Sequence, residues 1–295
     1  PVWKRSNGFL SRYMIDSLAS VKYAVLDKTE TPPRGFEKIG ENENYNIYRN
    51  NYSMPLGVVI DQTISIEDFE KLSIRQKDVA LLNCIVSDDI QESNLTQYQN
   101  ELNVESEEIT LEEMYLEGIT LAVKNDMYEI QCESEDFNRI CLQTKDMQWT
   151  EDNEYIVSFK IYSPTENSIF IQWNEGDVWK QKIISVTEGM NNVNFTIDYK
   201  NTDTLCMYFQ KGTYQIGNLH YESSSEDAID EVYQSGISEK SFLQMDTYEN
   251  NLITGTIETE KDSFLLFMIP FDKNWELYVD GKEAQLQQVD YGFMG

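Results

Sequence analysis

The stretch Phe264-Leu-Leu-Phe-Met-Ile-Pro-Phe-Asp-Lys-Asn-Trp-Glu-Leu-Tyr-Val-Asp-Gly-Lys282 carries the clearest structural signals in this chain of 295 residues. Its apolar run, Phe264 to Ile269, has the length of a buried strand and is far short of the roughly 18 residues that cross a bilayer. Pro270 predicts a turn, and Asp280-Gly281 is the usual signal of a tight hairpin. The stretch therefore predicts a strand, a turn that carries Trp275 and a hairpin, and it contains no pattern typical of a catalytic centre.

Apolar and polar residues alternate through the middle of the chain, from residue 118 to residue 222. Alternation of period two places apolar side chains on one face of a strand, and the turns between the segments are rich in Asn, Gly, Asp and Ser. This pattern predicts an antiparallel β-sandwich of the jelly-roll type, as found in carbohydrate-binding proteins. The clearest segments are Tyr155–Ile161, Ile169–Trp173, Val193–Tyr199 and Leu205–Phe209.

The predicted fold is mainly β with a smaller α/β part. Helical periodicity appears near residues 12–19 and 66–86, so the α/β part lies at the N-terminus. Three short C-terminal strands bury little surface alone, so we expect them to pack on the sandwich. The predicted units are a mixed α/β unit (1–90), an acidic linker (91–117), the β-sandwich (118–222), and a connector helix with a C-terminal β-hairpin segment (223–295).

The charge of the chain is strongly acidic. It has 23 Lys and Arg residues against 52 Asp and Glu residues, a formal net charge of −29. Such a field repels nucleic-acid phosphates and anionic head groups, so we exclude nucleic acid as a partner. Neutral sugars and divalent cations are compatible with it, although acidity by itself is typical of a solvated surface.

Cysteine and histidine are sparse, with four Cys and one His. No C-x-x-C pair is present, so we expect no metal site and no cofactor. Cys132 and Cys141 either pair across a predicted hairpin or are buried without a partner, and the sequence leaves both alternatives open. His220 lies in a strand-like segment with no nucleophile motif near it in sequence, so we expect no catalytic residue in this chain.

Aromatic residues give the candidate binding site. Trp173 and Trp179 flank a turn, and Trp173 shares its face with buried-type Ile residues, so we expect Trp179 to be the exposed one. Flat aromatic rings stack on sugars, and neighbouring amides bond the hydroxyl groups. The candidate carbohydrate-binding residues are Trp179, Gln172, Asn174 and Trp149.

Both ends of the chain resemble the YfhO family of bacterial multispanning membrane proteins. That family usually closes with an apolar strand, Pro-Tyr-Asp-x-Gly-Trp and a hairpin on Val-Asp-Gly-Lys. Ile269 to Trp275 and Val279 to Lys282 match this pattern, with Asn274 standing where Gly is usual. The matching segments nearer the N-terminus are Gly8–Tyr13, Val21–Tyr23, Ile47–Asn50, Met54–Gly57 and Arg75–Leu82.

The resemblance implies a soluble extracytoplasmic domain of a polytopic membrane protein, and a chain running from Pro1 to Gly295 fits an excised domain. The parent would look like a lipid-carrier-dependent glycosyltransferase acting on cell-envelope polymers, with its catalytic carboxylates near the first membrane spans. This domain would then be non-catalytic and would position the acceptor, and its partners would be its own transmembrane bundle and a teichoic-acid-type glycan. The alternative is a carbohydrate-binding module or adhesin with no catalytic role. An independent hydrolase is disfavoured because nucleophile and base are both missing.

Overall fold

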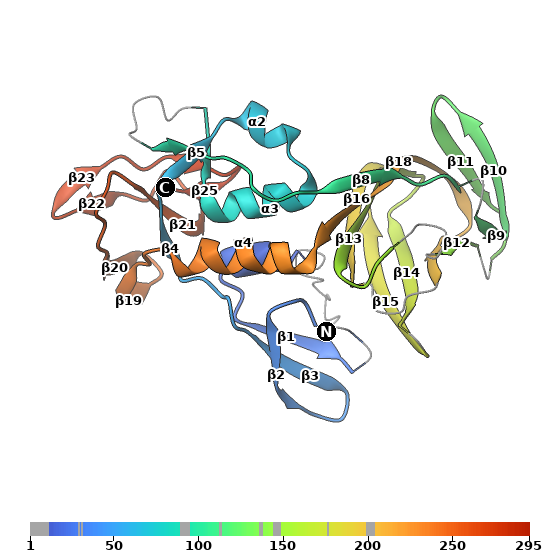
Figure 1. The fold of residues 1–295 in the computed structure, drawn as a ribbon, viewed down its shortest axis with the longest axis horizontal. Helices are drawn as coiled ribbons and strands as arrows, with labels where there is room; N and C mark the ends of the chain where they lie inside the picture. Colours follow the sequence, from blue (N-terminus) through green and yellow to red (C-terminus); the bar gives the residue numbers. More distant parts are fainter. Residues whose placement is uncertain are drawn as a thin grey trace.

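The computed structural model describes residues 12–28, 30, 32–88, 95–111, 114–135, 138–143, 149–175, 177–198 and 204–295. The fold is mainly β, as predicted, with four described helices. Figure 1 shows the β-sandwich at one end of the molecule, the C-terminal hairpins at the other, and helices α3 and α4 between them.

The sandwich consists of two antiparallel sheets, which confirms the prediction from alternation. Their inward side chains form one large apolar core that includes Tyr155, Val157, Phe159, Ile169 and Ile171. One sheet has the order β10-β11-β18-β13-β16, with β8 also on β18, and the other has the order β15-β14-β17-β12-β9. The first contains β8 (Glu105–Glu108), β10 (Ile119–Lys124), β11 (Met127–Cys132), β13 (Asn153–Ser163), β16 (Gly189–Asp198) and β18 (Gly212–Ser225). The second contains β9 (Tyr115–Glu117), β12 (Arg139–Gln143), β14 (Asn167–Glu175), β15 (Val178–Val186) and β17 (Thr204–Tyr208).

The disulfide differs from the pairing considered from sequence. Cys141 of β12 bonds Cys206 of β17, its direct neighbour in the register. Cys132 is a buried free thiol at the end of β11 in the other sheet. Of the two alternatives, Cys132 is buried without a partner, and its pairing with Cys141 is excluded because these two strands, although close in sequence, belong to different layers of the sandwich.

The N-terminal part is a mixed α/β unit. The region predicted as helical, residues 66–86, forms two helices separated at Leu72 and Ser73 and then a short strand. Ser73 starts the second helix with a capping box. Its hydroxyl oxygen accepts the backbone N–H of Gln76, and the side-chain oxygen of Gln76 accepts the backbone N–H of Ser73. The elements are α1 (Tyr13–Leu18), β1 (Tyr23–Asp27), β2 (Phe36–Glu41), β3 (Tyr45–Asn50), β4 (Gly57–Ile60), β5 (Gln62–Ile64), α2 (Ile66–Lys71), α3 (Ile74–Asn83), β6 (Ile85–Val86) and β7 (Thr96–Gln97).

The C-terminal strands pack on this N-terminal unit and not on the sandwich, which corrects the expected partner. β21 pairs antiparallel with β4, with Phe264 opposite Ile60 and Phe267 opposite Gly57. Leu266 then joins α1, α3 and α4 in a second apolar core, separate from that of the sandwich. β4 is a buried apolar strand, and β21 pairs with one edge of it. On the other edge the Val59 N–H donates to the Ser241 carbonyl, and the Leu243 N–H donates to the Gly57 carbonyl. The C-terminal elements are α4 (Glu226–Ser238), β19 (Gln244–Glu249), β20 (Leu252–Thr256), β21 (Phe264–Pro270), β22 (Leu277–Val279), β23 (Lys282–Ala284), β24 (Gln288–Val289) and β25 (Phe293–Met294).

The segment predicted as an acidic linker runs between the two bodies and is hydrogen-bonded at both ends. Its β7 lies parallel to β5, and its β8 joins the sandwich beside β18. Buried charges also connect the bodies, because Arg75 of α3 forms an ion pair with Glu154 of β13. The carboxylate of Glu222 in β18 accepts the Ile74 N–H at the start of α3, at 3.0 Å.

Candidate functional site

Three of the four candidate residues lie together on the outward face of the β15-β14-β17-β12-β9 sheet, called here the outer sheet face. Along β14 the buried side chains are Ile169, Ile171 and Trp173, so Gln172 and Asn174 point away from the core. The register places Asn174 directly opposite Trp179 of β15, and Gln172 opposite Gln181. Because paired residues on neighbouring strands share a face, the structure brings Trp179, Asn174 and Gln172 together.

The two tryptophans beside the turn take the positions expected of them. Trp173 is 8% exposed and belongs to the sandwich core, whereas Trp179 is 53% exposed. The Asn174 side-chain oxygen accepts the backbone N–H of Thr204 at 2.8 Å, which ties it to the start of β17. Trp179 therefore presents its indole to solvent beside an amide that is held in place.

The fourth candidate, Trp149, is not part of this site. It is 7% exposed, and its ring stacks on Tyr155 with the centroids 4.3 Å apart. Tyr221 packs edge-on against the same indole at 5.5 Å. Sequence proximity suggested a role beside the turn, but this aromatic cluster belongs to the core, where an indole has no face to offer a sugar.

The outer sheet face also carries residues that the sequence analysis did not identify. Phe170, Tyr208, Arg139 and Glu117 form a row across β14, β17, β12 and β9. The Arg139 guanidinium bonds Glu117 at 2.6 Å and lies 5.8 Å from the ring centre of Tyr115. Its hydrogen bond to the Tyr208 hydroxyl, with the Glu117 charge, raises the pKa of Arg139. Alternation in the sequence predicts which face of a strand a side chain occupies, but it does not predict the order of the strands. The row could therefore not be predicted from the sequence.

The disulfide lies in the next row of the same face. Gln172 pairs with Cys206, Cys206 with Cys141, and Cys141 with Tyr115. The covalent bond fixes β12 against β17 at the middle of the face. Trp179 and Phe170 lie on the strands to one side of it, and Tyr115 lies on the strand to the other side. Phe170 is 39% exposed and Tyr115 is 57% exposed, so rings are open to solvent on both sides of the disulfide.

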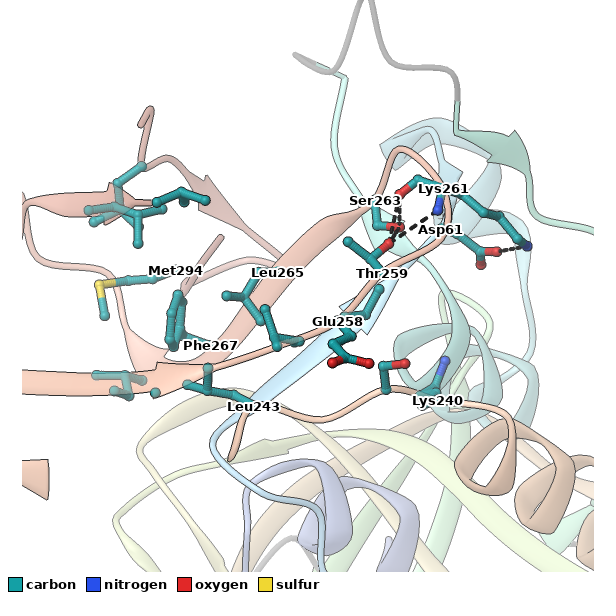
Figure 2. A pocket seen from close by; sticks show the side chains of 18 of the residues that line it. Asp61, Lys240, Leu243, Glu258, Thr259, Lys261, Ser263, Leu265, Phe267 and Met294 are labelled. Atoms are coloured by element: carbon teal, nitrogen blue, oxygen red, sulfur yellow. Dashed lines mark hydrogen bonds and ion pairs between the residues drawn. The ribbon is translucent and has the colours of Figure 1, made fainter. Parts of the chain in front are cut away.

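A second feature is a cavity of about 1680 Å³ between α4, β4 and the C-terminal hairpins. Figure 2 shows Lys240 facing this cavity from one side, with the Asp61–Lys261 pair above it, and that pair is 2.6 Å long. Burial lowers the pKa of Lys240 to about 8, and the hydrogen bond from Lys261 lowers the pKa of Asp61. The hydroxyls of Thr259 and Ser263 bond each other at 2.9 Å, and the described lining residues include no His or Cys. The cavity is therefore lined by charged and hydroxyl-bearing side chains together with apolar ones.

The described part of the chain holds no group of three or more His, Cys, Asp or Glu side chains arranged to hold a metal ion. Within the same ranges, no helix is both long enough and apolar enough to cross a bilayer.

The architecture is that of an aromatic-bearing β-sandwich joined to a mixed α/β unit, and comparisons with known proteins place it in a family. Residues 4–295 match the family described as "Bacterial membrane protein YfhO". The chain therefore belongs to the YfhO family, as the two terminal motifs predicted. The curated relative "Uncharacterized protein YfhO" of Bacillus subtilis (strain 168) is 25% identical over 285 residues, which cover 95% of this chain and 31% of the relative. The chain thus spans about a third of the length of that relative.

Solved structures similar to part of this chain include carbohydrate-binding modules and an agarase. A family 29 carbohydrate-binding module aligns with a TM-score of 0.33 at 13% identity, covering 41% of this chain and 90% of the module. Another from Piromyces equi gives a TM-score of 0.31 at 11% identity, covering 39% of this chain and 82% of the module. An agarase gives a TM-score of 0.32 at 10% identity, covering 40% of this chain and 23% of the agarase.

Proposed function

We propose that this chain is an extracytoplasmic accessory domain of a YfhO-family membrane protein, and that its outer sheet face binds a saccharide chain of the cell envelope. The parent would be a lipid-carrier-dependent glycosyltransferase, and this domain would hold the acceptor polymer for it. The observation that carries the proposal is the arrangement of exposed aromatic rings and side-chain amides on one open sheet. Trp179, Phe170 and Tyr115 supply the rings, and Gln172 and Gln181 supply the amides.

The size of the face favours a chain of sugars over a single sugar. Trp179 lies on the edge strand β15 and Tyr115 on the opposite edge strand β9. Neighbouring strands lie about 4.8 Å apart, so four spacings separate the two edges by about 19 Å. Aromatic rings at such a separation suit several consecutive residues of an oligosaccharide, each presenting its C–H surface to a ring.

The polar groups of the face suit a ligand rich in hydroxyl groups. Amides donate and accept hydrogen bonds, so Gln172 and Gln181 match hydroxyls that do the same. The Arg139–Glu117 pair provides donors and acceptors in a fixed arrangement, and its two charges cancel. Neutral saccharides therefore meet little electrostatic repulsion here, even on a chain with a net charge of −29.

Affinity electrophoresis of the full 295-residue chain tests this function, in gels containing teichoic-acid polymer or a neutral glucan polymer. We expect retardation, with Kd about ten-fold weaker for Trp179→Ala and again for Tyr115→Ala, since one stacked ring contributes about 1 kcal/mol or more. Tyr248→Ala is the matched control, because Tyr248 is 66% exposed but lies on β19, outside the face. The proposal is wrong if no envelope glycan retards the chain, or if the control weakens retardation as much as Trp179→Ala.

A further inference from the structure

The outer sheet face carries little charge, although the chain as a whole is strongly acidic. The chain has 52 Asp and Glu residues against 23 Lys and Arg residues. Among the described residues that point outward from the five strands of this face, Arg139 is the one cation and Glu117 the one anion. Lys180 and Lys182 of β15 belong to the opposite side of that strand, because they alternate with Trp179. The charge that a ligand meets on the face is therefore decided by a single pair.

Glu117 and two tyrosines occupy the groups through which Arg139 could bind a ligand. The Arg139 Nε lies 2.6 Å from a carboxylate oxygen of Glu117, and Nη1 donates to the Tyr208 hydroxyl at 3.4 Å. The guanidinium carbon lies 5.8 Å from the ring centre of Tyr115 and 5.9 Å from that of Tyr208. A guanidinium binds phosphate or carboxylate through two parallel N–H groups, and one such edge already faces Glu117. An anionic ligand can use that edge only by displacing Glu117.

The position of the pair suits a role in ligand choice better than a role in stability. The register places Glu117 on the edge strand β9, directly opposite Arg139 of β12. The two side chains are 42% and 34% exposed, so the pair faces the solvent from which a ligand arrives. Ion pairs at such exposure add little to stability. Their effect on which charges can approach the face does not depend on that contribution.

We propose that Glu117 is a specificity-determining residue that cancels the charge of Arg139 and so restricts the outer sheet face to uncharged saccharide chains. Polymers that carry phosphate or carboxylate groups would be excluded. Such a polymer is repelled by the acidic chain over the screening length of about 8 Å and finds no uncompensated cation on the face to offset that repulsion. The inference rests on the proposed function, because it names the class of saccharide that the same face accepts.

Affinity electrophoresis of the full chain in two gels tests the inference, one containing a neutral glucan and the other poly(glycerol phosphate). We expect the glucan to retard the wild-type chain, and poly(glycerol phosphate) to give a Kd at least about ten-fold weaker at low salt, because like charges oppose its approach. The measured quantity is the ratio of the two Kd values. This ratio reports ligand charge and is insensitive to losses that affect both polymers alike.

The variant Glu117→Gln keeps a hydrogen-bonding oxygen beside Arg139 and removes the negative charge. It should shift the ratio about five-fold toward poly(glycerol phosphate), because a phosphate then no longer has to break the ion pair. The shift should decline as salt rises. A variant that fails to fold would lose retardation in both gels and could not produce this shift. Glu117→Gln combined with Arg139→Gln should lose the shift, since the guanidinium that would bind the phosphate is gone.

Glu129→Gln is the matched control. Glu129 pairs with Lys124 at 2.6 Å on the β10–β11 hairpin of the other sheet, so this variant removes the same charge and releases a cation away from the face. The control should leave the ratio unchanged. The inference is overturned if poly(glycerol phosphate) retards the wild-type chain as strongly as the glucan, if Glu117→Gln leaves the ratio unchanged, or if Glu129→Gln shifts it equally. Retardation by poly(glycerol phosphate) alone overturns the inference and leaves the proposed function standing, whereas retardation by neither polymer rejects both.

Discussion

Arg75 is the buried cation between the α/β unit and the sandwich, and its removal should be severely destabilising. It is 1% exposed and forms ion pairs with Asp78, at 3.2 Å, and with Glu154. Its guanidinium also lies 5.0 Å from the ring centre of Tyr13. Replacing Arg75 by Met keeps most of the apolar volume but leaves the Glu154 carboxylate buried without its counter-charge.

The expected cost follows from which carboxylate loses its partner. Asp78 keeps a second cation, since Arg12 donates to it from Nε at 2.8 Å. Glu154 is 3% exposed, and Arg75 is its ion-pair partner among the described residues. Breaking a buried pair on one side costs about 3–5 kcal/mol, so Arg75→Met should lower the free energy of unfolding by about 4 kcal/mol. A domain with a total stability of about 5–15 kcal/mol would lose a large part of it.

Urea unfolding, followed by tryptophan fluorescence and circular dichroism, measures this change. The double variant Arg75→Met with Glu154→Gln should recover at least half of the loss, because no charge is then left uncompensated. Lys38→Met is the exposed control, since the Lys38–Glu41 pair is solvated and its loss should change the free energy of unfolding little. The reasoning is refuted if Arg75→Met costs no more than this control, or if the double variant is as unstable as the single one.

Three further predictions concern Asp290, the Cys141–Cys206 disulfide and Lys240. Burial raises the pKa of Asp290 to about 7, so the folded state holds a proton that the unfolded state releases above about pH 4, and stability falls as the pH rises from 4 to 7. Asp290→Asn keeps an acceptor for the Val86 N–H and should raise the unfolding free energy at pH 8 by about 2–4 kcal/mol but little at pH 4, as urea titrations at both pH values will show. Reduction of Cys141–Cys206, which are 65 residues apart, should lower the unfolding free energy by about 4 kcal/mol and weaken glycan retardation, whereas unchanged stability in dithiothreitol would contradict it. Lys240, with its pKa lowered to about 8, should acetylate ahead of the exposed lysines at pH 8 in peptide mass spectra, and equal rates would contradict the lowered pKa.

Local patterns predicted what depends on neighbouring residues in the chain. Alternation around Tyr155 and Ile169 identified the sandwich, because the side-chain period of a strand is a property of the strand alone. The same reasoning placed Trp173 in the core and Trp179 in solvent. The sequence of the two termini also identified the family, since those motifs are short and contiguous.

Features that depend on which strands become neighbours were not predictable in this way. The Cys141–Cys206 bond and the row from Phe170 to Arg139 both require the order of β12, β14 and β17. Trp149 was misplaced for the same reason, because its stacking partner Tyr155 is set by how the chain enters β13. Patterns in a single sequence predict which face of a strand a side chain occupies. They do not predict which strands become neighbours or which side chains pack against that face.

The pairing of β4 with β21 has a consequence for synthesis of the protein. The two strands lie about 200 residues apart, and at about 5–20 residues per second the ribosome needs about 10–40 s to make the second after the first. Throughout that interval β4 lacks its neighbour while the complete sandwich, whose strands lie between the two, has time to fold. The emerging chain therefore carries an unpaired apolar strand for tens of seconds, and the N-terminal unit becomes native only after β21 has been synthesised.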